Sequence, residues 1–107
     1  YTGWSSSTGE ADWGLRPLFA GDKTPPSMYN ISYYKNPTVD ADIMKALGTT
    51  DRAEKTKLYT EVQEEIWKDA PWAFLVTEKL LYATSKKLTG MYVMPDANYF
   101  FEEIDLQ

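Results

Sequence analysis

Polar side chains of several kinds gather between residues 3 and 16, in the stretch GWSSSTGEADWGLR. The four consecutive hydroxyls of residues 5–8 can hydrogen-bond a ligand without adding charge. Asp12 can hold an ammonium group, and Arg16 can hold a carboxylate through two parallel hydrogen bonds. Trp4 and Trp13 add large flat surfaces, each with one polar N–H. The combination suits a small zwitterion such as an amino acid or a short peptide.

The candidate ligand contacts are therefore Trp4, Ser5, Ser6, Ser7, Thr8, Asp12 and Arg16. A second interpretation of the same residues remains open. In it, Asp12 caps a helical turn, Arg16 is exposed to solvent and both tryptophans belong to the core.

Catalysis and metal binding have weaker support in the sequence. The chain contains neither histidine nor cysteine, so it lacks the commonest general base and any thiol nucleophile. Glu10 and Asp12 could serve a small carboxylate-pair hydrolase, since glycosidases use two carboxylates about 5–10 Å apart. Pairs of acids are common in any acidic chain, however. We expect no enzyme, no metal site and no cofactor.

The composition is that of a folded acidic protein. The 107 residues are 43% hydrophobic, and the formal net charge is -5. No apolar run approaches the ~20 residues that cross a bilayer, and the acidic balance argues against nucleic acid as a partner. Aromatic residues make up 15% of the chain. This content leaves open a stand-alone aromatic-rich interaction or carbohydrate-binding module.

The first third of the chain predicts a strand end, a short helix and a long loop. Residues 1–4 are typical of the end of a strand. DWGLRPLF predicts a single helical turn, capped by Asp12 and kept short by Pro17. Residues 20–37 contain several prolines and predict a long surface connection. We expect three tyrosines to anchor this loop to the core: Tyr29, Tyr33 and Tyr34.

Two longer helices are predicted next. Thr38 is the expected cap of the helix over VDADIMKALG, and Gly48 is its expected end. Val39, Ile43 and Leu47 recur in this helix at a spacing of four residues. A helix over 51–70 begins with Asp51 and Glu54 at the spacing of a capping box. Its apolar stripe consists of Leu58 or Tyr59, Val62, Ile66 and Ala70.

Strands are expected after Pro71, which ends the long helix. The segment WAFLVTEKLLYATS is rich in β-branched and aromatic residues, and its run AFLV predicts a strand buried on both faces. We expect the apolar stripe of the long helix to pack against a strand that contains Phe74 and Val76. KKLTGMYVMP predicts a turn and another strand. The order of elements predicts a mixed α/β architecture.

Three stretches of the chain also carry a resemblance to a known family. The first is a Gly-Trp strand end followed by a turn with a late acid, at Gly3, Trp4 and Asp12. The second is the helix DRAEKTKLYTEVQEEIWKDAPW, through its Leu-Tyr, its Gln63 and its closing Ala-Pro-Trp. The third is LTGMYVMPDANYFFEEIDL. Together they resemble the C-terminal part of family 5 extracellular solute-binding proteins, the periplasmic dipeptide, oligopeptide and glutathione binders of ABC importers.

The resemblance is strongest to the glutathione-binding branch. It implies an α/β fragment of a two-lobe periplasmic binding protein-like fold, with a mixed sheet and two helices. Residues 1–78 would belong to the C-terminal ligand-binding lobe. Residues 79–107 would form the hinge crossing and a segment that returns to the N-terminal lobe.

The function that the resemblance implies is the capture of a small peptide-like ligand. Glutathione is the favoured ligand, and a dipeptide, an oligopeptide or another small solute is the alternative. The implied location is the periplasm or a lipid-anchored extracytoplasmic site, and the implied partner is the membrane permease of an ABC importer.

One position departs from the family pattern. Dipeptide and oligopeptide binders commonly place an Asp a few residues after the Gly-Trp, where it holds the α-amine of the ligand. This chain has Ser7 near that place. The change disfavours an ordinary dipeptide and fits the γ-glutamyl group of glutathione, which carries its own amine and carboxylate.

The returning segment has a consequence for assembly. If the chain exists alone, the apolar side chains of residues 79–107 would lack their covering lobe. Open apolar surface and strand edges favour pairing with another chain. We therefore expect a dimer or strand exchange through this segment.

Overall fold

The computed structural model describes residues 2–94 and 96–107. Its helices are α1 (Ala11–Phe19), α2 (Pro37–Gly48) and α3 (Arg52–Asp69). Its strands are β1 (Leu88–Thr89), β2 (Tyr92–Val93), β3 (Tyr99–Phe100) and β4 (Asp105–Leu106). The strands form two antiparallel two-stranded sheets, β1 with β4 and β2 with β3. The mixed α/β class expected from the sequence is confirmed.

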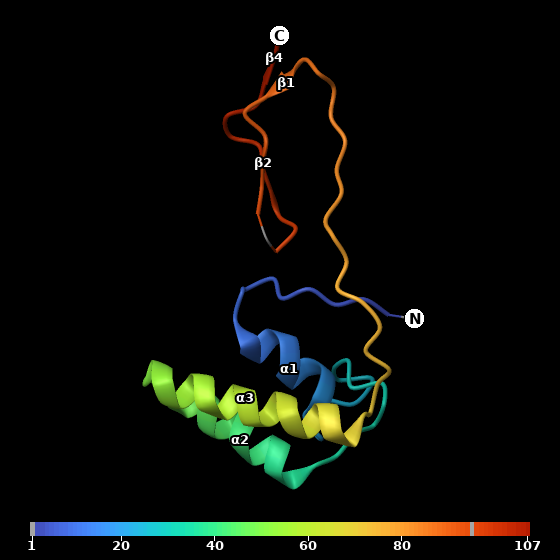
Figure 1. The fold of residues 1–107 in the computed structure, drawn as a ribbon, viewed down its shortest axis with the longest axis vertical. Helices are drawn as coiled ribbons and strands as arrows, with labels where there is room; N and C mark the ends of the chain where they lie inside the picture. The colour runs from blue at the N-terminus through green and yellow to red at the C-terminus, as the bar shows by residue number, and fades with distance from the viewer. Residues whose placement is uncertain (1, 95) are drawn as a thin grey trace.

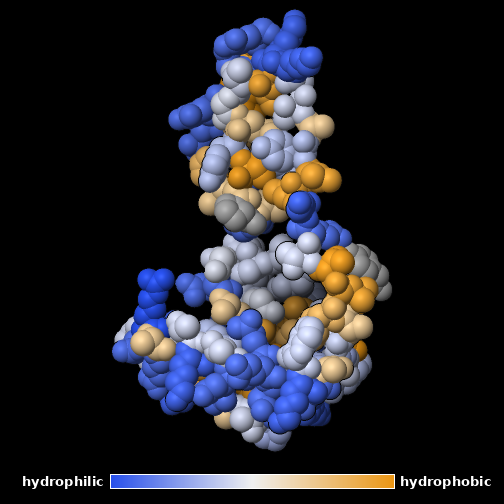
Figure 2. All heavy atoms as spheres, viewed as in Figure 1, coloured by the Kyte–Doolittle hydropathy of each residue, from blue (hydrophilic) through white to orange (hydrophobic). Residues whose placement is uncertain are grey.

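The molecule is elongated. Its Cα radius of gyration is 17.6 Å, whereas a compact chain of this length has a radius of about 13 Å. The helices lie together at one end and the strands at the other, joined by an extended segment (Figure 1). Apolar side chains gather along that segment and among the strands, while the helices turn a largely hydrophilic face outward (Figure 2).

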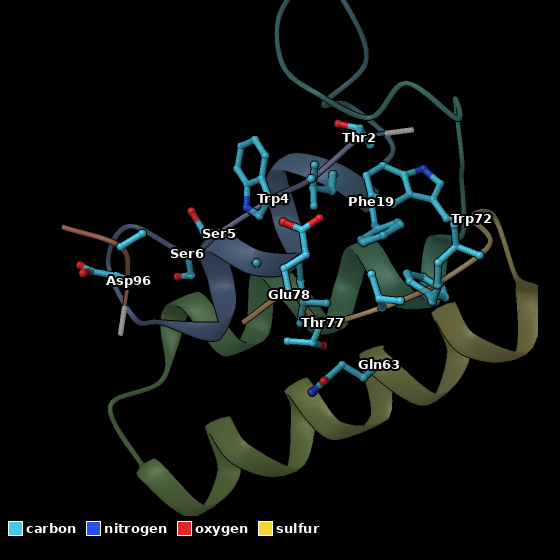
Figure 3. Close-up of a pocket in the computed structure, with 18 of the residues that line it drawn as sticks. Thr2, Trp4, Ser5, Ser6, Phe19, Gln63, Trp72, Thr77, Glu78 and Asp96 are labelled. Carbon is cyan, nitrogen blue, oxygen red and sulfur yellow. The ribbon is translucent and has the colours of Figure 1, made fainter. Parts of the chain in front are cut away.

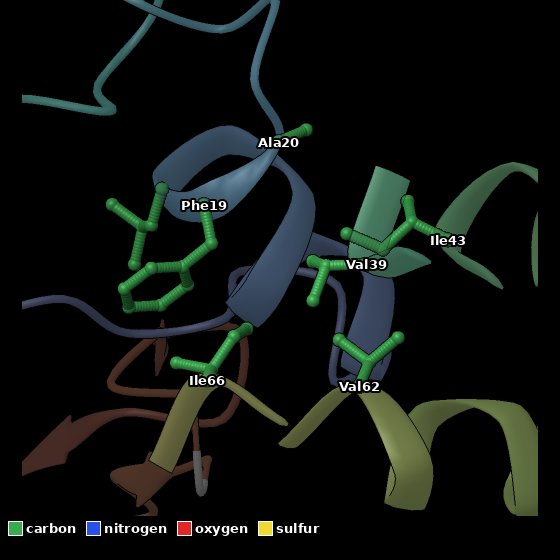
Figure 4. Packing of buried hydrophobic residues seen from close by; sticks show 7 residues of the cluster. Phe19, Ala20, Val39, Ile43, Val62 and Ile66 are labelled. Carbon is green, nitrogen blue, oxygen red and sulfur yellow. The ribbon is translucent and has the colours of Figure 1, made fainter. Parts of the chain in front are cut away.

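The hydrophobic core lies where the three helices meet. Its buried residues are Leu18, Phe19, Ala20, Val39, Ile43, Val62 and Ile66. Figure 4 shows α1, α2 and α3 each contributing side chains to this cluster. Val62 and Ile66 are therefore buried as expected, but they face the other two helices.

The expected strand after Pro71 is wrong. Residues 73–85 have no secondary structure, and Leu75 and Val76 are each 72% exposed. A strand needs a neighbouring strand to hydrogen-bond, and the described residues provide none beside this segment. Phe74 stacks instead on Trp67 of α3, with ring centroids 5.6 Å apart.

The N-terminal part also differs from the prediction. Residues 2–4 form no strand, and residue 1 lies outside the described residues. Glu10 precedes α1, so Asp12 lies in the first turn and does not cap the helix. The helix also runs through Pro17 instead of ending after one turn. Pro17 lacks the N–H that would bond the Trp13 carbonyl, and the Trp4 indole Nε1–H donates to that carbonyl at 2.8 Å.

The cap of α2 lies slightly earlier than predicted. The Asn36 side chain accepts hydrogen bonds from the N–H groups of Thr38 and Val39. Pro37 then occupies the first helical position, where its missing N–H costs nothing. Thr38 is therefore inside the helix. Leu47 is exposed, and Ala46 is buried in its place against α3.

The limits of α3 agree with the sequence. The Asp51 side chain accepts a hydrogen bond from the Glu54 N–H at 2.8 Å, as the predicted cap requires. The helix ends at Asp69, and Ala70 follows in the left-handed conformation with φ 47°. Ala70 is exposed and does not extend the apolar stripe.

The loop between α1 and α2 is closed around Asn30, which is 0% exposed. Its Nδ2 donates to the carbonyls of Ala20 and Tyr34 at 3.0 and 2.8 Å. Its Oδ1 accepts from the Tyr34 N–H at 3.1 Å and from the Ser32 hydroxyl at 3.0 Å. Tyr34 packs on the core as expected, whereas Tyr29 and Tyr33 are exposed.

Asp69 ties the end of α3 to the start of α2. Its Oδ2 accepts hydrogen bonds from the Tyr34 hydroxyl at 2.6 Å and from the Asn36 amide at 2.9 Å. These bonds lower the pKa of Asp69 below its ordinary value. Burial, together with the hydrogen bond to Asp69, raises the pKa of Tyr34 to about 12.

We expect Asp69→Asn to flatten the acid limb of the stability curve. Because the pKa of Asp69 is lowered by folding, its contribution is present above the pKa of an unfolded Asp, about 3.9, and is lost as pH falls through the folded value. Urea unfolding at several pH values measures this effect. Below about pH 4, the free energy of unfolding should fall more steeply with decreasing pH in the wild type than in Asp69→Asn. Tyr34→Phe leaves only the Asn36 donor and should give an intermediate slope. Equal slopes in all three proteins would contradict the proposed connection between the hydrogen bonds of Asp69 and stability at low pH.

Candidate functional site

A broad groove lies between α1, α3 and the segment that follows α3 (Figure 3). Its volume is about 1810 Å³, larger than the roughly 300–1000 Å³ of a typical small-ligand site. Its polar lining includes Ser5, Ser6, Thr8, Gln63, Thr77 and Glu78. Its aromatic lining consists of Trp4, Phe19, Trp67, Trp72 and Phe74. Met94, Asp96 and Ala97, between β2 and β3, also line it.

The structure brings part of the predicted site to this groove. The predicted contacts that line it are Trp4, Ser5, Ser6 and Thr8. The Ser6 hydroxyl donates to the Glu10 carbonyl at 2.9 Å, and the Thr8 hydroxyl accepts from the Glu10 N–H at 3.2 Å. These two bonds shape the turn at the start of α1.

The Ser5 hydroxyl differs from its neighbours. It makes no hydrogen bond to any residue that the structure describes, and it lies exposed on the groove. It can therefore bond a ligand without breaking a contact inside the protein. Ser7 is exposed as well, but it is not part of the groove lining.

Asp12 and Arg16 are brought together with each other. Arg16 Nε donates to Asp12 Oδ1 at 2.8 Å, and Arg16 Nη2 donates to Asp12 Oδ2 at 2.7 Å. The pair is partly buried, with side chains 17% and 25% exposed respectively. The hydrogen bond to Asp12 raises the pKa of Arg16. Burial raises the pKa of Tyr59, and the negative charge of Asp12 raises it further.

Asp12 was expected to hold a cationic group of a ligand, and Arg16 was expected to hold a carboxylate. In the structure each of them holds the other instead. Neither residue is part of the groove lining. Direct contact of Asp12 or Arg16 with a ligand stays a prediction.

The aromatic side of the groove was missed in the sequence. Trp67 belongs to α3, and Trp72 and Phe74 belong to the segment after it. Phe74 stacks on Trp67, and the Trp72 ring lies 5.0 Å from that of Phe19. Trp67 is 69% exposed on a helix face whose neighbouring residues are polar. A large aromatic residue at such a position was the signal that could have found this surface.

No group of three or more acidic, histidine or cysteine side chains among residues 2–94 and 96–107 is arranged to hold a metal ion. None of the helices described there is long and apolar enough to cross a membrane.

Comparison with known proteins gives a clear result. No protein-family model matches the chain. The chain is 61% identical over 106 residues to the glutathione-binding protein GsiB of Pectobacterium atrosepticum. It is 54% identical over 107 residues to the proteins of the same name from Salmonella typhimurium and Escherichia coli. The relatives are thus named as binding proteins.

The similarity covers 99–100% of this chain and 21% of each relative. The chain therefore spans about a fifth of the length of the curated relatives it matches. The resemblance seen in the sequence is confirmed: over its whole length the chain matches the C-terminal part of the glutathione-binding protein GsiB, a family 5 solute-binding protein.

Proposed function

We propose that this chain supplies one side of the ligand cleft of a periplasmic solute-binding protein that captures glutathione for an ABC importer. The observation that carries the proposal is that Ser5, Ser6 and Thr8 line the same groove as the aromatic residues of α3 and of the segment after it. Relatives with 54–61% identity over the whole chain are named for glutathione binding, which supports the same class of ligand. The proposal is one of binding without catalysis, in keeping with that name.

The groove suits such a ligand chemically. Uncharged hydroxyls can bond the carboxylates and amides of a small peptide, and aromatic rings can cover its apolar surface. The groove is too wide to enclose a tripeptide alone. Periplasmic binding proteins close two lobes around a ligand by a hinge motion. We therefore assign the opposite side of the cleft to a part of the protein outside this chain.

The division of the chain follows from the same proposal. We assign residues 1–78 to the C-terminal lobe, since the three helices pack on one another. We assign residues 79–107 to the segment that returns to the N-terminal lobe. Its exposed apolar side chains, such as Leu81 and Phe100, fit a surface covered by another part of the protein. In an isolated fragment the same side chains favour a dimer or strand exchange, which stays a prediction.

Ser5→Ala tests the proposed function in the full-length protein. It removes the hydroxyl that has no partner among the described residues. We expect the affinity for glutathione to fall by about 0.5–1.5 kcal/mol, the net contribution of one hydrogen bond. Isothermal titration calorimetry measures this change.

The matched control is Ser27→Ala. Ser27 is an exposed serine in the loop between α1 and α2, outside the groove lining. Its removal should leave the affinity unchanged. Equal losses in the two variants would remove the turn from the site, and a wild-type protein that binds a dipeptide but not glutathione would overturn the proposed ligand.

A further inference from the structure

Trp4 makes an unusual contact with α1. Inside a helix, the N–H of residue 17 would bond the carbonyl of Trp13, but Pro17 has no N–H. The Trp4 indole Nε1–H donates to this carbonyl at 2.8 Å. The Trp4 ring also lies 5.0 Å from the Tyr29 ring and 5.9 Å from the Trp13 ring. The residue before the hydroxyl turn is thus attached to both α1 and the following loop.

The turn of residues 5–8 is held at two points as a result. The Trp4 N–H fixes its first end to the Trp13 carbonyl in α1. The hydroxyls of Ser6 and Thr8 fix its last end to the backbone of Glu10, where α1 begins. Ser5 lies between the two points, on the groove (Figure 3). Its hydroxyl can be placed accurately only while both attachments hold.

We propose that Trp4 is a positioning residue of the ligand site, and that its N–H binds α1 and not the ligand. Trp has a single donor, and at 2.8 Å that donor is fully used. Turning it toward a ligand would leave the Trp13 carbonyl without a donor in a partly buried place. The ligand therefore meets the ring of Trp4, and the hydroxyl of Ser5 supplies the hydrogen bond. This inference rests on the proposed function.

The test begins with Trp4→Phe in the full-length protein. The variant keeps an aromatic ring and removes the indole N–H. We expect the affinity for glutathione to fall by about threefold to tenfold in calorimetric titration, as for the loss of one hydrogen bond. Trp13→Phe is the matched control, because it makes the same chemical change and leaves the Trp13 backbone carbonyl in place. It should change the affinity by less than about twofold.

Pro17→Ala completes a double-mutant cycle. It supplies a backbone N–H that competes with the Trp4 indole for the Trp13 carbonyl, so Pro17→Ala alone should already weaken the attachment of Trp4 to α1. In the Pro17→Ala background, Trp4→Phe should change the affinity by less than about twofold. A merely structural role of the Trp4 ring would give the same loss in both backgrounds. That result, or an equal loss in Trp4→Phe and Trp13→Phe, would overturn the inference.

Amide hydrogen exchange separates this inference from the proposed function. The Gly9 N–H bonds the Ser6 carbonyl at 3.3 Å and reports on the turn without any ligand. Trp4→Phe should speed exchange at Gly9, Trp13→Phe should not, and Pro17→Ala should reduce the effect of Trp4→Phe. Failure of the wild-type protein to bind glutathione would defeat the proposed function alone. Unchanged exchange at Gly9 in Trp4→Phe would defeat the positioning role.

Discussion

Asn30→Asp is expected to lower the free energy of unfolding by about 3–5 kcal/mol, the cost of leaving a charge buried without a partner. The Asn30 side chain is fully buried, and its Nδ2 donates to the carbonyls of Ala20 and Tyr34. The substitution keeps the shape of the side chain and replaces that donor with an oxygen. The carboxylate would then face two carbonyl oxygens without a proton between them. Urea unfolding at neutral pH measures the loss.

The pH dependence distinguishes this cause from a general loss of packing. Burial and the two facing carbonyls should raise the pKa of the introduced carboxyl. The destabilisation should therefore be full at neutral pH and become smaller as pH falls through the raised pKa, because the neutral acid can donate one hydrogen bond. Asn98→Asp makes the same change at an exposed position, where the lost donor bonds the Asp96 carboxylate and the new charge stays in water, and it should cost about 1 kcal/mol or less. A pH-independent loss at position 30 would contradict the assigned cause.

The sequence predicted the two longer helices well because their signals are local. The Asp51 cap and the apolar stripe of α3 depend on residues three or four positions apart. The start of α2 was misplaced slightly, because Asn36 followed by Pro37 makes a better start than Thr38. That signal was local as well.

The errors came where distant residues decide the structure. α1 continues through Pro17, and Trp4 donates to the Trp13 carbonyl that Pro17 leaves without a helical partner; the pattern around Pro17 contains no sign of this bond. The run AFLV has the composition of a buried strand. Composition alone does not form a strand, since the partner strand must come from elsewhere. Among the described residues, no strand pairs with this segment.

The candidate site was predicted in part for the same reason. The hydroxyls of residues 5–8 are consecutive, so a turn that presents them could be predicted from the sequence. Asp12 and Arg16 are four residues apart on one helix, a spacing that favours pairing with each other. Both residues were predicted either to contact a ligand or to cap a turn and face solvent, and neither alternative included the pair. Trp67, Trp72 and Phe74 lie on α3 and the segment after it, and only the folded chain brings them into the same groove as the turn.

Gly90→Ala is expected to abolish the pairing of β1 with β4. Gly90 has φ +76°, and an added Cβ would lie 1.8 Å from the Glu103 carbonyl oxygen. The left-handed conformation costs a non-glycine residue about 1–2 kcal/mol, and an overpacked contact costs a further 1–3 kcal/mol or so. A two-stranded sheet is only marginally stable. The sum therefore exceeds what this pairing can absorb, and the backbone at Glu103 must move away.

Amide hydrogen exchange at Gln107 measures this loss, because its N–H bonds the Lys87 carbonyl at 3.0 Å beside the paired strands. Gly9→Ala is the matched control. Gly9 also has a positive φ, +68°, but nothing lies within 4 Å of an added Cβ. Gly9→Ala should therefore add only the cost of the left-handed conformation, which is confined to its own turn. Exchange at Gln107 should stay unchanged. If the Gln107 amide stayed as protected in Gly90→Ala as in the wild type, the pairing of β1 with β4 would not depend on the close approach of Glu103 to Gly90. If both variants lost protection there equally, the loss would be a general effect of the substitutions and not of the clash at Gly90.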